Sequence, residues 1–227
     1  MASAVAKPRR AKTPRTTRDV ILDTAERHFA ERGFDGVSVR EIATDAGLKN
    51  QASLYHHFQN KRDLYEAVLS RGIDPIIAVV TASGLSDGND EIPAMPRDVV
   101  TGFLDRVVDY LLEHPYLPRL LQRAALDDSR YLRATLGRSL KPLYAQGIKV
   151  IAKSASGWEV DELLHLGVGL YLLIFGYFAN TQLIASVAGG DPLSPAAISR
   201  QRRFLRTAIG ELLDVGAAVP KPTRAKR

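Results

Sequence analysis

The sequence predicts an all-α fold. Apolar residues recur every three or four positions in most stretches between Thr17 and Leu212, which is the spacing of helices that bury one face. Several stretches begin at a Ser, Thr or Asn with an acidic residue three positions later, and this pairing caps helix starts. No stretch shows the convincing alternation of a half-buried strand. At 227 residues the chain can form one or two domains with a substantial core.

The first predicted helix covers residues 17–32. Thr16 and Asp19 cap its start, and Gly33 ends it. Its apolar stripe consists of Ile21, Leu22, Ala25 and Phe29. Residues after the helix are expected to close a small core: Phe34, Val37, Ile42, Leu48, Leu54 and Phe58.

Two short helices joined by a glycine turn are predicted next. Ser38 and Glu41 form a capping box at the start of the first. Gly47 can supply the positive φ that a tight turn between helices needs. Asn50 caps the second short helix, which is expected to run to about His57. Two short helices with such a turn are typical of a helix-turn-helix, whose second helix enters the DNA major groove.

A longer helix begins at Asn60, which caps it together with Asp63. Its apolar pattern continues toward Ile77 and Val80. Pro75 is expected to kink this helix or divide it in two, because proline cannot donate the backbone hydrogen bond and its ring crowds the preceding turn.

The same region resembles the N-terminal domain of the TetR family of transcriptional repressors. The residues that carry the resemblance are Ser38-Val39-Arg40-Glu41-Ile42-Ala43, Ala46-Gly47-Leu48, Leu54-Tyr55-His56-His57-Phe58 and Asn60-Lys61. It covers about residues 17–70. The family usually has four residues between the turn and the Leu-Tyr pair, whereas Leu48 and Leu54 enclose five. We therefore expect Asn50 at the usual cap and Lys49 as an extra turn residue.

The second short helix and its flanks supply the candidate DNA contacts. Gln51 and Ser53 lie on its first turn, where side chains reach base edges, and glutamine can pair with adenine. Tyr55 and Lys61 are better suited to phosphates, and the resemblance implies the same role. Arg40 is expected to reach a phosphate or a guanine, although an exposed polar residue without a role is the alternative. The full predicted set is Arg40, Lys49, Asn50, Gln51, Ala52, Ser53, Tyr55, His56, His57 and Lys61.

Positive charge is concentrated in the two ends of the chain. The net charge is +6; residues 1–18 carry +6 and residues 221–227 carry +4, which leaves −4 for the middle. Residues 1–15 and 218–227 are expected to be disordered basic segments. Such segments beside a helix-turn-helix are suited to attract DNA phosphates, and plain solubilising tails are the alternative.

Composition limits the remaining possibilities. The chain has no cysteine, so disulfides and thiolate metal sites are excluded, which fits a cytoplasmic location. The basic N-terminus is not followed by an apolar signal core, so export is not expected. No phosphate-binding loop, dinucleotide fingerprint, nucleophile elbow or zinc-protease motif is present, and we predict no catalytic residues and no cofactor. A metal site is not expected, because the adjacent His56 and His57 point about 100° apart on a helix.

The rest of the chain is predicted to form a larger helical domain over residues 71–217. A loop is expected at residues 84–96, which are rich in Gly, Pro and Asp. The predicted helices cover residues 98–113, 115–126, 128–154 with a bend at Pro142, 161–188, and a last helix that Ser194 and Pro195 open.

Two apolar features suggest contact with a second chain. Residues 163–179 are almost entirely apolar. They are barely long enough to span a membrane, and we expect burial in a core or subunit interface instead. Gly169 and Gly176 share one face, where close helix approach would explain them. A heptad-spaced stripe in the last helix is either core or interface, and the TetR resemblance implies a homodimer built by the last two long helices. The predicted interface is Gly169, Gly176, Ile198, Leu205 and Leu212.

The larger domain also contains aromatic residues with polar groups. Tyr171, Phe175, Phe178 and Gln182 would share one face of an uninterrupted helix. Such a stripe is either plain core or the lining of a pocket between helices. The resemblance implies a small-molecule effector that relieves DNA binding. The predicted ligand contacts are Tyr110, Tyr144, Tyr171, Phe175, Phe178 and Gln182.

Together these features predict a dimeric transcriptional regulator with an N-terminal helix-turn-helix domain at residues 16–70. We expect a sequence-specific repressor of operator DNA that a small-molecule effector releases. The alternatives are a nonspecific architectural DNA-binding protein, which would use the same motif and tails, and a helical protein-interaction adaptor. A palindrome beside the protein's own gene that the purified protein protects would favour the repressor.

Overall fold

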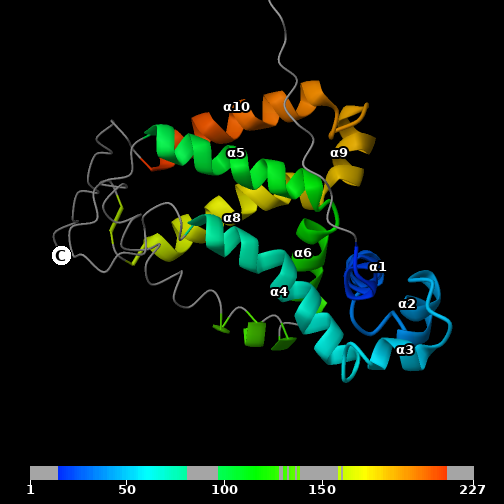
Figure 1. The fold of residues 1–227 in the computed structure, drawn as a ribbon. Helices are drawn as coiled ribbons and strands as arrows, with labels where there is room; N and C mark the ends of the chain where they lie inside the picture. The colour runs from blue at the N-terminus through cyan, green and yellow to red at the C-terminus, as the bar shows by residue number, and fades with distance from the viewer. Residues whose placement is uncertain are drawn as a thin grey trace, which may run out of the picture.

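The computed structural model describes residues 15–80, 97–127, 130–131, 133–135, 137–138, 158–159 and 161–213. These residues form helices, with no strand among them, which confirms the all-α prediction. The helices are α1 (Thr17–Arg32), α2 (Val39–Asp45), α3 (Gln51–Tyr55), α4 (Lys61–Val80), α5 (Arg97–Glu113), α6 (Leu117–Asp127), α8 (Leu163–Ala179), α9 (Thr181–Ala188) and α10 (Pro195–Leu212) (Figure 1).

Local capping chemistry sets the starts of the N-terminal helices. The Thr16 side chain accepts a hydrogen bond from the Asp19 backbone N–H at 3.1 Å, and Asp19 accepts one in return from the Thr16 backbone. Ser38 and Glu41 make the same reciprocal pair at α2. Gly33 ends α1 with a φ of 75°. These predictions are confirmed, because the two capping pairs and the glycine stop each depend only on local sequence.

Helix α4 connects the two parts of the molecule. It starts beside α3, where the Asn60 side chain accepts a hydrogen bond from the Asp63 backbone N–H at 2.9 Å. From there it extends as one helix to Val80, so Pro75 lies inside it and does not divide it. The boundary that we predicted at residues 70 and 71 therefore falls within a continuous helix.

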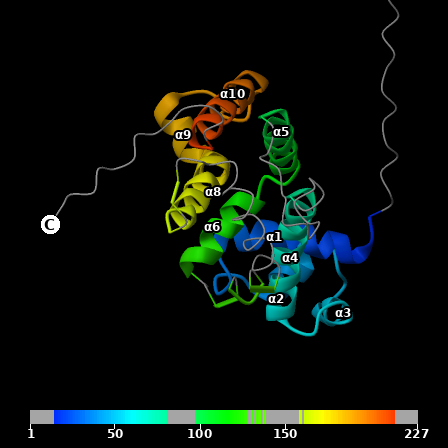
Figure 2. The same cartoon turned by 90° about the vertical axis from the view of Figure 1, so that its left-hand side faces the viewer.

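The helix-turn-helix packs directly on the larger part of the chain. Helix α1 lies against both α4 and α6, and α2 and α3 sit beyond α1, at the opposite end of the molecule from α9 and α10 (Figures 1 and 2). One continuous core runs from Phe29 and Tyr65 to Leu117 and Leu205. Any rearrangement of α6 must therefore be accommodated by α1, because close-packed interiors transmit displacement.

The C-terminal helices form a layered bundle. Helix α10 lies along α5 and also contacts α8, and α6 packs on α8 (Figure 1). Arg202 of α10 donates to the Asp105 carboxylate at 3.2 Å and also pairs with Asp109. Trp158 donates its indole N–H to the Leu212 carbonyl at 2.7 Å, which ties the end of α10 to the chain before α8. Specific polar bonds thus hold α10 both to α5 and to the chain before α8.

The apolar segment predicted as one helix over residues 161–188 is in fact two. Helices α8 and α9 meet at a 70° bend. Asn180 lies at the break, and its side-chain amide donates to the Gly176 carbonyl at 2.8 Å. Asparagine competes for backbone hydrogen bonds in this way, so it favours helix ends over helix interiors. In the described residues no single helix is long and apolar enough to cross a membrane, although α8 and α9 together pass that test.

The bend changes the predicted aromatic face. Tyr171, Phe175 and Phe178 belong to α8, whereas Gln182 belongs to α9 and lies beyond the break. The prediction that all four share one helix face is therefore wrong. The predicted loop at residues 84–96, residues 1–14 of the predicted N-terminal tail and the predicted C-terminal tail lie outside the described residues. So do Pro142, Tyr144 and most of the helix expected at 128–154.

Candidate nucleic-acid interface

Helix α3 is short, capped and exposed. Asn50 caps it as predicted, because its side-chain oxygen accepts from the Ser53 backbone N–H at 2.9 Å. The helix ends at Tyr55, two residues earlier than expected. Leu54 is fully buried and anchors the helix to the core. The exposed face is thus fixed in orientation by one cap and one apolar side chain.

The side chains of α3 differ in solvent exposure and in the hydrogen bonds that they already make. Gln51 and Ala52 are exposed, and the Gln51 amide donates to the Tyr55 hydroxyl at 3.0 Å. Tyr55 is 45% exposed. Ser53 is half-buried, and its hydroxyl donates to the capping oxygen of Asn50 at 3.0 Å. The Ser53 hydroxyl therefore serves the cap, which leaves Gln51 as the polar side chain on the first turn that can reach a base edge.

The turn before α3 accommodates the additional residue. Gly47 has a φ of 71°, which an L side chain rarely adopts. The Leu48 N–H donates to the Ala43 carbonyl at 2.9 Å and returns the chain to the core. Lys49 then lies exposed between this bond and the cap at Asn50. The extra residue is absorbed in the turn, so the cap remains at the position expected from the resemblance.

The other predicted DNA contacts lie around α3. Arg40 on α2, and His56 and His57 after α3, are exposed. Lys61 begins α4 and places its ammonium group 4.4 Å from the centre of the Phe34 ring. The predicted contacts thus come from the end of the molecule that carries α2, α3 and the start of α4 (Figure 1). Among the described residues no cluster of three or more potential metal ligands occurs.

Aromatic rings behind Lys61 connect it to the larger domain. Phe34 packs against Tyr65 at 5.1 Å and against Tyr131 at 4.7 Å between ring centres. Arg62 lies 5.6 Å from the centre of the Tyr131 ring. Tyr131 follows α6 in the chain, so a residue of the larger domain touches the ring on which Lys61 lies. Sequence reasoning missed this contact, because Phe34 and Tyr131 are far apart in the sequence.

Charged side chains hold α2 to α1. Arg32 on α1 donates to Glu41 on α2 at 2.7 Å. Asp45 lies 2.8 Å from the Nε2 atom of the buried His28 and 3.3 Å from Arg27. The hydrogen bond with His28 is the main reason that the pKa of Asp45 is lowered. These contacts hold α2 against α1, which packs on the larger domain. Because a short turn joins α2 to α3, they also restrict the position of α3.

The α2 capping box should make stability depend on acidity. The hydrogen bond with Ser38, followed by that with Arg32, lowers the pKa of Glu41 from 4.5 to about 2. A depressed folded-state pKa stabilises the fold above the unfolded pKa and loses this effect as pH falls toward the folded value. The stability difference between the native chain and Glu41→Gln should therefore shrink as pH falls from 4.5 to about 2. Urea unfolding across that range measures it, and a difference independent of pH would contradict the assignment.

The predicted ligand residues that the structure describes, which exclude Tyr144, are not brought together in one place. Phe178 and Gln182 line a cavity between α6 and the α8–α9 bend. Tyr171 and Phe175 stack on each other at 5.0 Å and lie outside that cavity. The Tyr110 hydroxyl instead donates to the backbone carbonyl of Gly72 on α4 at 3.1 Å. Burial raises the pKa of Tyr110 to about 12, so this hydroxyl stays protonated and keeps donating.

The predicted interface residues fall into two groups. Ile198 and Leu205 are buried within the chain, and Leu212 packs against the same core, because α10 lies on α5 and α8. Within the described part of the chain the heptad stripe therefore packs on intrachain core, and its contribution to a dimer interface stays a prediction. Gly169 and Gly176 differ, because a methyl group added at either would meet nothing within 4 Å in the described part of the chain. The close approach we expected at these glycines is not made within that part.

Similar proteins are known for the N-terminal part of the chain. Residues 21–68 match the family described as bacterial regulatory proteins, tetR family. HTH-type transcriptional repressor SCO4008 of Streptomyces coelicolor is 32% identical over 112 residues, which cover 49% of this chain and 50% of that protein. HTH-type transcriptional repressor KstR2 of Mycolicibacterium smegmatis is 43% identical over 61 residues, which cover 27% of this chain and 29% of that protein. The chain thus spans half the length of these curated relatives or less.

Solved structures extend the likeness to the whole fold. The putative transcriptional regulator SCO4942 from Streptomyces coelicolor has a TM-score of 0.58 and 21% identity, over 86% of this chain and 97% of that one. A putative TetR-family transcriptional regulator from Rhodococcus sp. has a TM-score of 0.55 and 21% identity, over 87% of this chain and 98% of that one. At this identity the likeness describes the fold alone.

Proposed function

We propose that this chain, whose residues 21–68 match the tetR family of bacterial regulatory proteins, is a transcriptional repressor that binds operator DNA. The observation that carries the proposal is that α3 is both exposed to solvent and held rigidly. It is exposed, capped by Asn50 and anchored by the buried Leu54, so Gln51 and Tyr55 are presented on a rigid frame. A recognition helix must be held in this way, because base contacts depend on a fixed approach to the major groove.

The active species is a homodimer in this proposal. Operator half-sites lie about one helical turn, roughly 34 Å, apart or at multiples of it, so two recognition helices at a fixed separation are needed. Helix α8 exposes Leu164, Val168 and Leu172, the last of them 59% exposed. Beside them, Gly169 and Gly176 leave space that no described residue of the chain fills. An apolar face next to small residues supports close approach of a second α8.

An effector bound in the larger domain releases the DNA. A ligand can shift the equilibrium only by binding the DNA-competent and DNA-incompetent arrangements with different affinities. Three connections support this coupling: the continuous α4, the packing of α6 on α1, and the contact of Tyr131 with Phe34. By reciprocity, operator DNA should weaken effector binding by the same factor.

Footprinting of DNA that flanks the protein's own gene tests the proposal. The purified protein should protect one palindromic site whose half-sites are separated by about one helical turn or a multiple of it. Protection should survive an excess of unrelated DNA, because specific sites are typically bound about 10³-fold or more tightly than nonspecific DNA. Uniform coverage with no preferred site would instead favour the architectural alternative.

A further inference from the structure

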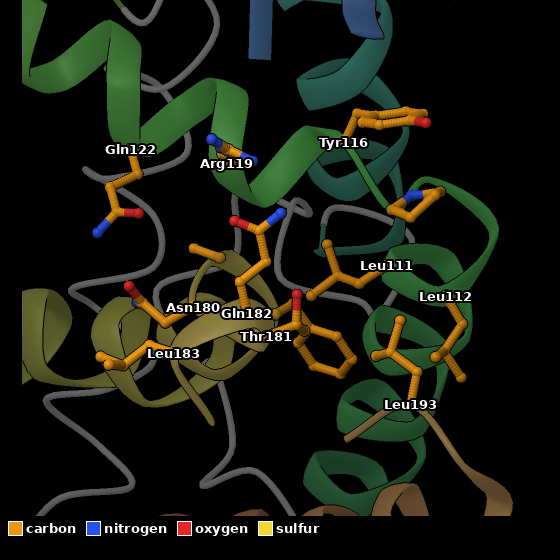
Figure 3. Close-up of a pocket in the computed structure, with 13 residues that line it drawn as sticks. Leu111, Leu112, Tyr116, Arg119, Gln122, Asn180, Thr181, Gln182, Leu183 and Leu193 are labelled. Carbon is orange, nitrogen blue, oxygen red and sulfur yellow. The ribbon is translucent and has the colours of Figure 1, made fainter. Parts of the chain in front are cut away.

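A cavity of about 440 Å³ lies between α6 and the bend that joins α8 to α9 (Figure 3). This is within the range of about 300–1,000 Å³ typical of small-molecule sites. Residues on both sides of the bend line the cavity, since Phe178 belongs to α8 and Gln182 belongs to α9. Residues from four helices line it, and of the predicted ligand contacts that are described only Phe178 and Gln182 are among them.

Arg119 is the only charged residue among the described residues that line this cavity. It lies in the first turn of α6 and is half-buried. It makes no hydrogen bond or ion pair with any residue that the structure describes. By contrast, the half-buried Arg27, Arg71 and Arg202 each pair with a carboxylate. A half-buried guanidinium without a counterion favours an anion in the adjacent space, because its charge is only partly hydrated there.

Several polar side chains of the cavity lie together around Arg119 (Figure 3). The Gln182 side chain points toward Arg119, and Gln122 and Asn180 lie near them (Figure 3). On the other side of the cavity, Leu111, Leu112 and Leu193 lie together (Figure 3). The amides can donate to oxygen atoms that the guanidinium does not reach. The lining thus matches a ligand with an anionic group at one end and an apolar body at the other.

We propose that this cavity binds an amphipathic carboxylate, with its charged group on Arg119 and its apolar part against the leucines. A carboxylate is matched best, because the planar guanidinium can donate two parallel hydrogen bonds to it. If the chain is the effector-released repressor proposed above, this ligand class is its effector. The binding itself can be measured without DNA.

The position of Arg119 also connects the ligand to the helix-turn-helix. Two residues earlier on α6, Leu117 is fully buried. A methyl group added to Gly72 of α4 would come within 2.3 Å of a Leu117 side-chain carbon, so α4 and α6 touch closely there. Helix α6 also packs on α1. A ligand that moves the start of α6 therefore acts on both helices that carry the DNA-binding end.

Calorimetry on the full chain with three probes of equal length tests the proposal. Octanoate should bind about tenfold or more tightly than 1-octanol or octylamine, since a hydrogen-bonded charge pair contributes about that factor. Acetate should bind more weakly than octanoate, because it lacks the apolar part. Equal binding of octanoate and octanol, or no binding of octanoate to folded protein, would overturn the proposal.

Three variants locate the effect. Arg119→Gln should remove the preference for octanoate, and Arg119→Lys should retain part of it. Arg203→Gln is the matched control, because it removes an equal charge from an exposed position on α10 outside the cavity. Circular dichroism verifies that each variant is folded. Unchanged octanoate binding in folded Arg119→Gln would refute the site.

Operator binding with and without octanoate separates this site from the proposed function. Octanoate bound through Arg119 with no effect on DNA affinity would leave the site intact and remove its role as effector site. Failure of the protein to bind any operator, with octanoate binding intact, would overturn the repressor proposal alone. Operator binding without octanoate binding would overturn the carboxylate site alone.

Discussion

Replacing Arg71 with methionine should lower the free energy of unfolding by about 2–3 kcal/mol. Arg71 of α4 donates to Asp23 and to Glu26 of α1, both at 2.7 Å. Glu26 is only 5% exposed. The variant would leave its carboxylate without a cation in a site that water hardly reaches, and uncompensated buried charge is strongly destabilising. Urea unfolding followed by circular dichroism measures the difference.

Two features of Arg71 make the expected loss of unfolding free energy smaller than that of breaking a fully buried ion pair. A quarter of the Arg71 side chain is exposed, so water screens part of the charge. Its Nε atom is also buried without a hydrogen-bond partner, and methionine removes that unfavourable group. A loss within about 0.5 kcal/mol of zero would show that the carboxylates are hydrated in solution.

Two further variants distinguish charge from packing. Arg71→Met combined with Glu26→Leu should recover about 1 kcal/mol or more relative to Arg71→Met alone, because the stranded carboxylate is gone. Arg138→Met is the control, since Arg138 is 62% exposed and pairs with Glu66 at 3.5 Å. Its effect should stay within about 0.5 kcal/mol, as for other surface ion pairs. An equal loss in both single variants would contradict the role of burial.

The ion pairs of Arg71 with Asp23 and Glu26 could not be predicted from the sequence. The capping pairs at Thr16, Ser38 and Asn50 were predicted correctly because both partners lie within three residues, where helix geometry fixes their distance. Arg71 and its partners are 45 and 48 residues apart. Nothing local relates their positions, so this cluster appears only when α1 packs on α4.

In the larger domain, the spacing of apolar residues predicted which helix faces are buried but not what covers them. The heptad stripe of α10 correctly indicated a buried face, but the pattern does not say whether the covering helix belongs to the same chain. Leu205 is fully buried by its own chain. The bend at Asn180 was missed because the apolar pattern of α8 continues through Leu183. The cavity beside it was consequently missed except for Phe178 and Gln182, since its lining comes from four helices.

The DNA contacts themselves stay predictions, but the helix-turn-helix motif correctly placed the candidate residues on and around α3, because their spacing is local. The structure refined one role. Ser53 was expected to face base edges, yet its hydroxyl donates to the capping oxygen of Asn50. Gln51, by contrast, is exposed, and its amide is held by the Tyr55 hydroxyl. Base recognition on the first turn of α3 is therefore expected to depend on Gln51 far more than on Ser53.

Gln51→Ala should weaken binding to the footprinted operator by about 1–3 kcal/mol for each half-site and relax preference at one base pair. The reason is that glutamine can bond two edge atoms of one adenine, and alanine offers neither bond. Fluorescence anisotropy with operators substituted singly at each position measures both effects. A symmetric dimer places one Gln51 in each half-site. Substituting the contacted base pair in one half-site should therefore cost half as much binding free energy as substituting it in both.

Ser53→Ala and Lys61→Ala are the matched comparisons. Ser53→Ala should leave base preference unchanged, because the Ser53 backbone N–H still donates to Asn50. Lys61→Ala should weaken every DNA to a similar extent and reduce the salt dependence, as expected where a phosphate contact is lost. Gln51→Ala should leave the salt dependence nearly unchanged, since it removes no charge. If Gln51→Ala instead weakened all sequences equally, α3 would not read bases through Gln51, and the recognition role would have to pass to the exposed residues around it.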